Sequence, residues 1–453
     1  MSNMNTIRMT SQQYSELRQT LLSSENETAV FLVSGTFRND EGIHFVVRDV
    51  ITLAEKDYDH RSGYHIQVSP IFFNKVINIA EANGITIIQC HSHPFSENKL
   101  GYSYTDNYGE SRSAKTILDC LGTPMGSLLF GPNQVIGRVW LSPNKKPETI
   151  DQLRIVGRRL KIKEIGRKNK TRKIDIMIYD RQILGISLKG QQLLSQLKIG
   201  IVGLGGTGSA VAEQLVRAGV TNYKIIDDDI FEPSNKTRLY GSYASDNNQY
   251  KTKIVKRNIQ RIQPSATVTE IRKKITTEQD LEELLSCDVV FSCTDKHIPR
   301  SLLSNFVYQY FIPVIDVGVG IDVENETIVG ANVRATLIGP GLPCLYCIGI
   351  VDPEVILAES LPLEERKTRL QEGYIVGLDD DVPSVIEATT QAASMGILLL
   401  KNLLFGIINT QANTLALDLT TFQSSRLAAS VKPDCVCLFR KGKGSKQGVV
   451  GGE

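Results

Sequence analysis

The chain has 453 residues, of which 41% are hydrophobic, and its formal net charge is +2. This length predicts two or three domains, and the near-neutral charge gives no reason to expect nucleic acid or a membrane as partner. The first thirty residues hold no long apolar segment, and the most apolar later stretch, MGILLLKNLLFGII, is interrupted by Lys401 and Asn402. We therefore expect no signal peptide, no membrane span, a cytoplasmic location, and cysteines that are reduced or metal-bound.

The first 150 residues are predicted to form a small α/β domain. The segments ETAVFLVSGTF and GIHFVVRDVITL are typical of strands. SPIFFNKVINIAEANG is typical of a helix that begins after Ser69 and stops at Gly84. The apolar run ITIIQCHSHP predicts a buried strand that ends in two histidines, and MGSLLFGPNQVIGRVWL predicts a hairpin.

A basic segment follows. Residues 154–173 contain ten Lys or Arg and a single acid, Glu164. Docking of an acidic partner or nucleic acid is one interpretation. No aromatic residues alternate with the charges, so a solvated linker over residues 151–175 is favoured.

Residues 176–440 alternate apolar strands with helices, which is typical of a Rossmann-like, doubly wound and mostly parallel sheet. The last segment, residues 441–453, is rich in glycine and lysine and is predicted to be flexible. It ends in VVGGE, whose diglycine raises the alternative that the chain is its own substrate.

The two histidines at the end of the predicted buried strand suggest a metal site. His91 and His93 alternate along a strand, so their rings point to one face. Asp106, at the start of the next helix, can complete a set of three zinc ligands that leaves a fourth position for water. A nearby carboxylate would then move a proton from that water to the leaving amine.

This order of residues, within residues 20–140, resembles the JAMM (MPN+) metalloprotease family, whose pattern is an upstream Glu, His-x-His and Ser-x-x-Asp. The chain offers ETAVFLVSG, HSHP and SYTD, with Glu25 as a weaker rival for the first position. Nine residues separate His93 from Ser103, which is longer than the family's spacing and is interpreted as an insertion. Histidines without metal are the alternative. The resemblance implies zinc ligands, a general acid/base and a donor to the oxyanion, which are His91, His93 and Asp106, then Glu27, then Ser103.

A glycine-rich segment, GLGGTGS, follows a predicted strand and opens a helix. Glycines let a backbone approach phosphates, and Asp227 at the end of the next strand could bind a ribose hydroxyl. An NAD-dependent dehydrogenase fits these facts equally well. The residues that discriminate are an amide, two cations and a carboxylate, which suit a triphosphate that loses pyrophosphate with Mg²⁺. They are Asn235, Arg238, Lys251 and Asp295.

From Tyr179 to Leu438 the chain resembles the ubiquitin-activating-enzyme-like adenylyltransferases of the ThiF/MoeB family. The resemblance implies that a protein's C-terminal carboxylate attacks the α-phosphate of ATP and releases pyrophosphate. It also implies a homodimer, because Arg181 in YDRQI matches an arginine that enters the partner subunit's ATP site. The residues assigned to ATP and Mg²⁺ are Gly203, Gly205, Gly206, Gly208, Asp227, Asp229, Asn235, Arg238, Lys251 (preferred to Lys253) and Asp295.

Two cysteine pairs, Cys344 with Cys347 and Cys435 with Cys437, suit a structural tetrahedral zinc, with two reduced surface pairs as the alternative. Family members that carry their substrate as a thioester have a cysteine after the first pair. This chain has none between residues 348 and 395. We therefore expect the reaction to stop at the acyl-adenylate, with a conjugating enzyme or a sulfur donor supplying the acceptor thiol.

Together the two resemblances predict a bifunctional enzyme that acts on the C-terminus of a ubiquitin-like protein, similar to fused proteins of bacterial ubiquitin-like modification operons. The zinc site would cleave a peptide or isopeptide bond there, either trimming a precursor or removing a conjugate. Two alternatives remain. One is adenylation for sulfur transfer, giving a thiocarboxylate on a small sulfur carrier. The other is a regulator that binds nucleotide without turnover.

Overall fold

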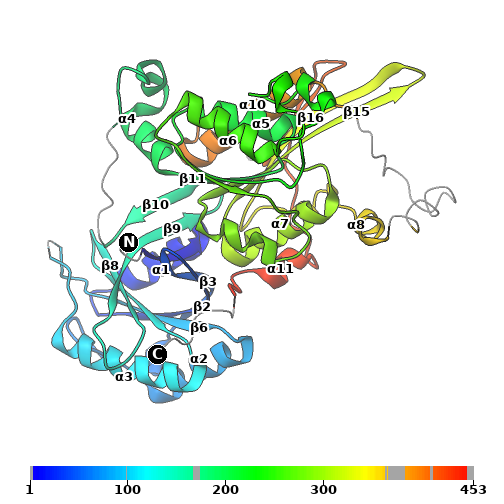
Figure 1. Ribbon diagram of the computed structural model, residues 1–453. Helices are drawn as coiled ribbons and strands as arrows, with labels where there is room; N and C mark the ends of the chain where they lie inside the picture. Colours follow the sequence, from blue (N-terminus) through cyan, green and yellow to red (C-terminus); the bar gives the residue numbers. More distant parts are fainter. Residues whose placement is uncertain are drawn as a thin grey trace. The chain divides into compact units, whose positions relative to one another are not determined.

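The protein divides into two compact units, each of which mixes helices and strands (Figure 1). In this computed structural model the described residues are 4–97, 99–166, 174–362, 365, 383–408 and 412–445. The first unit is Met1–Lys170 with Gln309–Phe311 and Arg440–Glu453, and the second is Thr171–Tyr308 with Ile312–Phe439. The predicted α/β class is confirmed. Within the described residues, no helix combines the length and apolar character needed to cross a membrane.

The first unit is built on a closed, barrel-like sheet. Its strands are β1 (Asn5–Thr10), β2 (Ala29–Asn39), β3 (Gly42–Thr52), β6 (Thr86–Ser92), β7 (Met125–Phe130), β8 (Val135–Trp140), β9 (Glu148–Val156) and β10 (Leu160–Glu164). Their order is β1-β3-β2-β6-β7-β8-β9-β10, and β1 also pairs with β9, which closes the ring. A separate two-stranded sheet joins β4 (Tyr58–Arg61) to β5 (Ile66–Val68).

Helices cover the two faces of this sheet because its strands alternate apolar residues inward and outward. In β2, Val30 and Leu32 belong to one buried cluster, whereas Phe31 and Val33 belong to another. The first cluster includes residues of α1 (Ser11–Leu22). The second includes residues of α2 (Pro70–Asn83) and α3 (Tyr104–Leu121). Helix α2 begins and ends where the sequence predicts, with Gly84 in a left-handed conformation (φ 60°).

The regular structure of the first unit extends beyond residue 150, into the expected linker. Residues 151–156 continue β9, and β10 follows after a short turn. Leu153 and Ile155 are buried in the closed sheet. Apolar residues therefore recur at every second position of this strand, although basic residues are frequent in the same segment. Residues 167–173 lie outside the described residues. At the other end of the chain Gly444 pairs with Thr36 of β2, and the terminal residues 446–453, with VVGGE, lie outside the described residues.

The second unit contains a sheet that is parallel in one half and antiparallel in the other. Its strands are β11 (Lys198–Val202), β12 (Asn222–Ile226), β13 (Thr267–Ile271), β14 (Val289–Ser292), β15 (Val314–Glu324), β16 (Thr327–Ile338), β17 (Thr414–Asp418) and β18 (Ser424–Leu427). The order is β13-β12-β11-β14-β15-β16-β17-β18, with parallel pairing from β13 to β15 and antiparallel pairing from β15 onward. The expected doubly wound sheet is therefore present, with an antiparallel extension.

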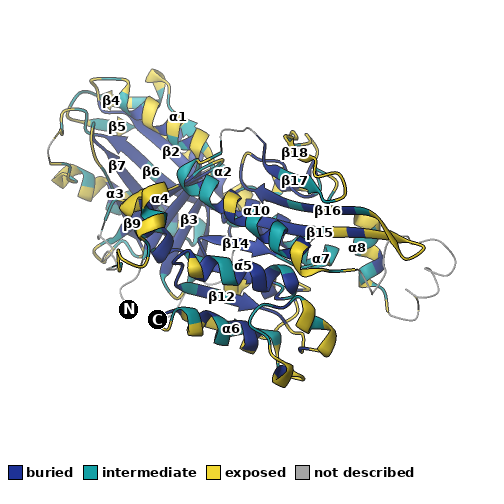
Figure 2. Cartoon of the chain, turned by 90° about the horizontal axis from the view of Figure 1, so that it is seen from above, coloured by how far each residue is buried: buried dark blue, intermediate teal, exposed yellow. Residues whose placement is uncertain are grey.

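Among its described residues the second unit has the helices α4 (Asp180–Gln196), α5 (Gly206–Arg217), α6 (Lys251–Ile262), α7 (His297–Tyr310), α8 (Pro353–Ser360), α10 (Ile386–Phe405) and α11 (Val436–Arg440), of which α7 and α11 end in residues of the first unit. Buried strands such as β12 and β14 lie beside helices whose outer faces are exposed (Figure 2). The strand order reverses between β11 and β14, so the loops after these two strands flank a topological switch point. In open α/β sheets this position is where ligands bind.

Candidate functional site

The glycine loop after β11 has a conformation that other residues could not adopt. Gly203 has φ 84°, and a Cβ on it would lie 2.7 Å from the carbonyl oxygen of Cys293. A Cβ on Gly208 would lie 1.8 Å from the carbonyl oxygen of Gly203. By contrast, a Cβ on Gly205, the N-cap of α5, would meet nothing within 4 Å. The loop is therefore closed on its inner side and open at the helix N-terminus, which fits the approach of a phosphate.

Asp227 and Asp229 follow β12 and lie beside this loop. Asp227 is only 9% exposed, and its two carboxylate oxygens accept hydrogen bonds from the N–H groups of Leu204 (2.6 Å) and Asp229 (2.8 Å). Burial raises the pKa of Asp227 to about 6, although Lys251 opposes the shift. Asp229 pairs with the ammonium of Lys251 at 2.6 Å. The structure thus ties the predicted ribose acid to the glycine loop and the predicted phosphate lysine to its neighbour.

The other predicted phosphate ligands make local contacts. Arg238 packs on the first turn of α5, since its Cγ and Cδ would lie 3.3 Å from a Cβ on Gly206. Its guanidinium donates to the carbonyl oxygen of Ser234 at 3.1 Å. Asn235 accepts a hydrogen bond from the N–H of Glu232 at 3.2 Å. Each contact uses only part of the side chain: Arg238 donates from one of its nitrogen atoms, and Asn235 accepts through Oδ1, so its Nδ2 donor takes no part in that bond.

Asp295 lies beyond the end of β14, and its carbonyl oxygen accepts from Arg300 at 3.4 Å. Beside it lies a charged cluster that the sequence reasoning missed. Asp316 is fully buried and contacts Ser292 (2.7 Å), Arg300 (3.3 Å) and Arg334 (2.6 Å). Burial opposes the ionisation of Asp316, but the two guanidiniums outweigh it and hold its pKa below the usual range. An aspartate inside the apolar run IPVIDVGVG was the available signal.

No contact of Arg181 with the other predicted nucleotide-binding residues is found among the described residues. Arg181 is the second residue of α4, its side chain is 90% exposed, and its guanidinium lies 3.7 Å from the carboxylate of Asp180. Apolar side chains of the same segment are also exposed, among them Met177 at 84% and Leu184 at 83%. The predicted role of Arg181 in a partner's site therefore stays a prediction.

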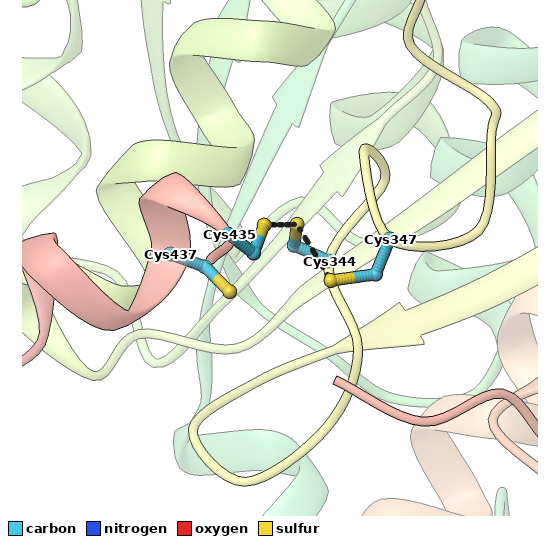
Figure 3. Close-up of side chains that lie close together, drawn as sticks. All are labelled: Cys344, Cys347, Cys435 and Cys437. Atoms are coloured by element: carbon cyan, nitrogen blue, oxygen red, sulfur yellow. Dashed lines mark hydrogen bonds between the residues drawn. The ribbon is translucent and has the colours of Figure 1, made fainter. Parts of the chain in front are cut away.

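The four predicted zinc-binding cysteines converge (Figure 3). Their sulfur atoms lie within 4.8 Å of one another, and all four residues are buried. The Sγ atoms of Cys344 and Cys347 are 3.6 Å apart and those of Cys344 and Cys435 are 3.2 Å apart, too far for a disulfide. A hydrogen bond with Cys437 lowers the pKa of Cys344 to about 5, which favours a thiolate. Four buried sulfur atoms at this spacing fit one tetrahedral metal ion, so the alternative of surface pairs is wrong.

A second cluster occupies the first unit, where β6 delivers His91 and His93. The Nε2 atoms of these histidines lie 3.2 Å and 3.4 Å from the two carboxylate oxygens of Asp106, on the first turn of α3. The carboxylate of Glu27, just before β2, lies 3.5 Å from His93 Nε2. Glu27 is buried and Glu25 is exposed, which favours the former. The longer loop between His93 and Ser103 therefore does not prevent Asp106 from reaching the histidines.

The electrostatics of this cluster suit a cation. His91 Nε2 is buried and makes no hydrogen bond of acceptable geometry to any residue that the structure describes. Burial raises the pKa of Asp106, but His91 and His93 outweigh it, and the pKa falls far below its usual range. Burial raises the pKa of Glu27, although His93 and His91 oppose the shift, and a raised pKa suits a carboxyl that exchanges protons. Three ligand atoms lie within 4.8 Å of one another, which fits a compact divalent ion.

Ser103 has a structural task in addition to the predicted one. Its hydroxyl accepts from the N–H of Asp106 at 3.1 Å, and the carboxylate of Asp106 accepts from the N–H of Ser103 at 2.6 Å. These two bonds form a capping box at the start of α3. The Ser-x-x-Asp spacing is therefore explained by the helix cap alone, and the oxyanion role of Ser103 stays a prediction.

The comparisons with known proteins match the second unit of the chain. The profile of the ThiF family matches residues 179–437, more than half of the chain. The sulfur carrier protein ThiS adenylyltransferase of Escherichia coli (strain K12) is 34% identical over 143 residues, 31% of this chain and 57% of that protein. A molybdopterin-synthase adenylyltransferase of Haemophilus influenzae is 31% identical over 150 residues, 33% of this chain and 61% of that protein. The chain thus spans less than two thirds of the length of these two relatives.

Among solved structures, E. coli MccB with succinimide is 18% identical with a TM-score of 0.46, covering 57% of this chain and 74% of that chain. The matched family range begins at residue 179, beyond the main segment of the first unit. The resemblance of residues 20–140 to the JAMM metalloproteases is therefore not confirmed by these comparisons and stays a prediction.

Proposed function

This chain belongs to the ThiF family, and we propose that its second unit adenylates the C-terminal carboxylate of a small sulfur-carrier or ubiquitin-like protein. The observation that carries the proposal is the open N-terminus of α5 at a switch point, with Asp227 and Lys251 beside it. Two similar proteins are named as adenylyltransferases, one of them for a sulfur carrier. The activity and substrate of this chain remain our proposal.

In this reaction the residues of the loop bind and neutralise the nucleotide. The backbone at Gly205 receives phosphate oxygens and Asp227 accepts from the ribose hydroxyls. Lys251 and Arg238 leave Asp229 and the Ser234 carbonyl oxygen to hold the pyrophosphate. Asp295 would hold Mg²⁺, which supplies charge neutralisation on the phosphates. A carboxylate oxygen of the carrier attacks the α-phosphorus, and the bond to pyrophosphate breaks with its electron pair on pyrophosphate.

Sulfur transfer is the fate of the adenylate that the comparisons favour, because one similar protein is named as the adenylyltransferase of a sulfur carrier protein. The chain has no cysteine between residues 348 and 395 that could form a thioester after the Cys344–Cys347 pair. The acyl-adenylate would therefore pass to an acceptor from another protein, such as the persulfide of a sulfur donor or the thiol of a conjugating enzyme. We further propose that the chain works as a homodimer, with Arg181 reaching the partner's nucleotide, and the exposed Met177 and Leu184 support this.

The decisive test is ATP–pyrophosphate exchange with small proteins that end in diglycine. We expect exchange that requires both the carrier and Mg²⁺ and that is lost when the last glycine is removed. Incubation with a sulfur donor should then replace one oxygen of the carrier by sulfur, which intact-mass analysis detects. Nucleotide binding without exchange for any carrier would instead identify a regulator.

A second candidate function rests on the cluster in the first unit. We propose that His91, His93 and Asp106 would hold zinc, which would supply an activated water, and that Glu27 is the general acid/base in cleavage of a bond beside the carrier's C-terminus. The convergence of the ligand atoms of His91, His93 and Asp106 and the approach of Glu27 to His93 favour it. Zinc content should fall by about one equivalent per chain in His91→Ala. Carriers extended beyond diglycine, or conjugated to a lysine, should be cleaved only by the zinc-loaded protein.

A further inference from the structure

A buried charged network lies directly behind the first turn of α3. Glu110 is 2% exposed and follows Asp106 by one helical turn, so both side chains lie on the same face. Its carboxylate accepts three hydrogen bonds from the sheet, from Ser127 Oγ (2.6 Å), Arg138 Nε (2.7 Å) and Trp140 Nε1 (2.9 Å). Helix α3 is therefore held to β7 and β8 by directional bonds as well as by apolar packing.

The same network also contacts Asn107, which follows Asp106, and Tyr102, which precedes the N-cap of α3. Arg138 donates to the side chain of Asn107 at 2.5 Å, and its guanidinium lies 3.5 Å from the centre of the Tyr102 ring. Tyr102 is the residue before the N-cap, and its ring lies 6.3 Å from that of His91. Both the approach to α3 and its first turn are thus fixed to one guanidinium that Glu110 neutralises.

Such a network is a poor way to gain stability. The desolvation of a buried carboxylate and guanidinium is of the same order as their attraction, and an apolar pair of similar size is often as stable. The benefit of the charged pair is direction, because three hydrogen bonds to one carboxylate, from Ser127, Arg138 and Trp140, restrict the orientation of the helix. The site that depends on this orientation is the carboxylate of Asp106, since zinc ligation tolerates only small errors of position.

We propose that Glu110 is a positioning residue that, through Arg138, aims the carboxylate of Asp106 at His91 and His93. Glu110 itself binds neither metal nor substrate. The inference rests on the proposed zinc site in the first unit. It assigns to Glu110 and Arg138 the task of setting the affinity and geometry of that site.

The test measures zinc affinity at the histidine site of the full chain by competition with a chelating dye, with His91→Ala as the reference that lacks the site. Glu110→Gln should weaken zinc binding about tenfold to a hundredfold, as removal of outer-sphere partners commonly does. When loaded with Co²⁺, Glu110→Gln should differ from the wild type in the visible absorption bands of the histidine site. The sulfur-to-cobalt charge-transfer bands, which report the cysteine site, should be the same in both proteins.

The matched control is Asp246→Asn in the second unit. Asp246 is also a nearly fully buried carboxylate (1% exposed) that pairs with an arginine, Arg257, at 2.6 Å. This control should leave zinc affinity at the histidine site unchanged. A loss shared by both variants would mean that any broken buried ion pair perturbs the site, and it would overturn the inference.

A double variant separates positioning from folding. Glu110→Leu with Arg138→Met removes both charges, so the first unit should stay folded by circular dichroism and yet bind zinc more weakly than the wild type. Wild-type affinity in either variant overturns the inference, and so does a loss that merely follows the unfolded fraction. If the wild type binds no more zinc than His91→Ala, the proposed zinc site itself falls and the role of Glu110 falls with it.

Discussion

The two candidate sites differ in how far they are assembled before any ligand arrives. In the first unit the four groups Glu27, His91, His93 and Asp106 already converge, with contacts of 3.2–3.5 Å between them. In the second unit Lys251 is paired with Asp229, and Arg238 is bonded to a carbonyl oxygen. A compact cation needs a preformed cage, whereas a polyphosphate can replace internal ion pairs as it binds.

Because of this difference, the two sites should respond differently to substitution. A preformed cluster holds like and unlike charges close together, so removing one member changes the chemistry of the others at once. A site that exchanges partners on binding loses ligand affinity or turnover but keeps its resting structure. A substitution in one site should therefore leave the chemistry of the other site unchanged.

The largest expected effect concerns Glu27. Glu27→Gln should lower cleavage of an extended carrier about a hundredfold to ten-thousandfold, because a positioned proton acceptor contributes this much. Zinc content should stay at the wild-type value, since Glu27 is outside the proposed ligand set. Cleavage rates and zinc content are measured on the same preparation. Persistent cleavage would assign the proton transfer elsewhere, and lost zinc would make Glu27 a ligand.

The next largest effect concerns Asp295. Asp295→Ala should reduce ATP–pyrophosphate exchange by about two to three orders of magnitude, because the proposed Mg²⁺ ligand is worth several kcal/mol in the transition state. Cleavage by the first unit should be unchanged. Exchange and cleavage are assayed in parallel, with Glu27→Gln as the reciprocal control. Parallel loss of both activities would contradict the independence of the sites.

In the second unit, the candidate site residues that directly follow short apolar strands could be predicted from the sequence. β11, β12 and β14 are local apolar runs, and Gly203, Asp227 and Asp295 follow them in the sequence. The antiparallel pairing of β15 with β16 and the partners of Asp316 were not predictable. They depend on strands and side chains distant in the sequence, such as Arg334, and local periodicity carries no information about them.

In the first unit, too, local sequence patterns predicted some elements and missed those that depend on distant partners. The boundaries of α2 and the histidine strand follow from local signals, whereas α1 was not predicted. The first part of the expected linker, however, belongs to β9 and β10, because the density of Lys and Arg concealed the alternation of Leu153 and Ile155. What makes residues 151–156 a strand is pairing with β1, a partner about 145 residues away. The Ser-x-x-Asp pattern was ambiguous for a different reason, since a capping box needs the same spacing.

A smaller effect is expected for Arg181, and it tests whether the nucleotide site is shared between subunits. Arg181→Ala should lower exchange about tenfold to a hundredfold, the value of a hydrogen bond from a charged group. Mixing this variant with Asp295→Ala should restore exchange, because one site of a mixed dimer then has both residues. Exchange is measured after co-expression and separation of tagged mixed dimers. Without restoration, Arg181 acts within its own subunit or has no role.

The smallest effect is a pH dependence of nucleotide binding that Asp227 should impose. Because burial raises its pKa to about 6, this carboxyl takes up a proton at a higher pH than an exposed aspartate does. A protonated carboxyl accepts weaker hydrogen bonds from ribose hydroxyls, so affinity should fall as the pH drops through about 6 and should be constant above about 7. The expected loss is about fivefold to tenfold, the difference between a charged and a neutral acceptor.

Calorimetric titration with ATP and Mg²⁺ at a series of pH values measures this dependence, and Asp227→Asn provides the control. The variant should bind more weakly at pH 7.5 and should show only the pH dependence of the nucleotide itself, since its amide does not titrate. The difference between the two curves isolates Asp227. A wild-type curve parallel to that of the variant would mean that the carboxylate is fully engaged by the N–H groups of Leu204 and Asp229. Asp227 would then order the glycine loop without contacting the ribose, and the second site would be as preformed as the first.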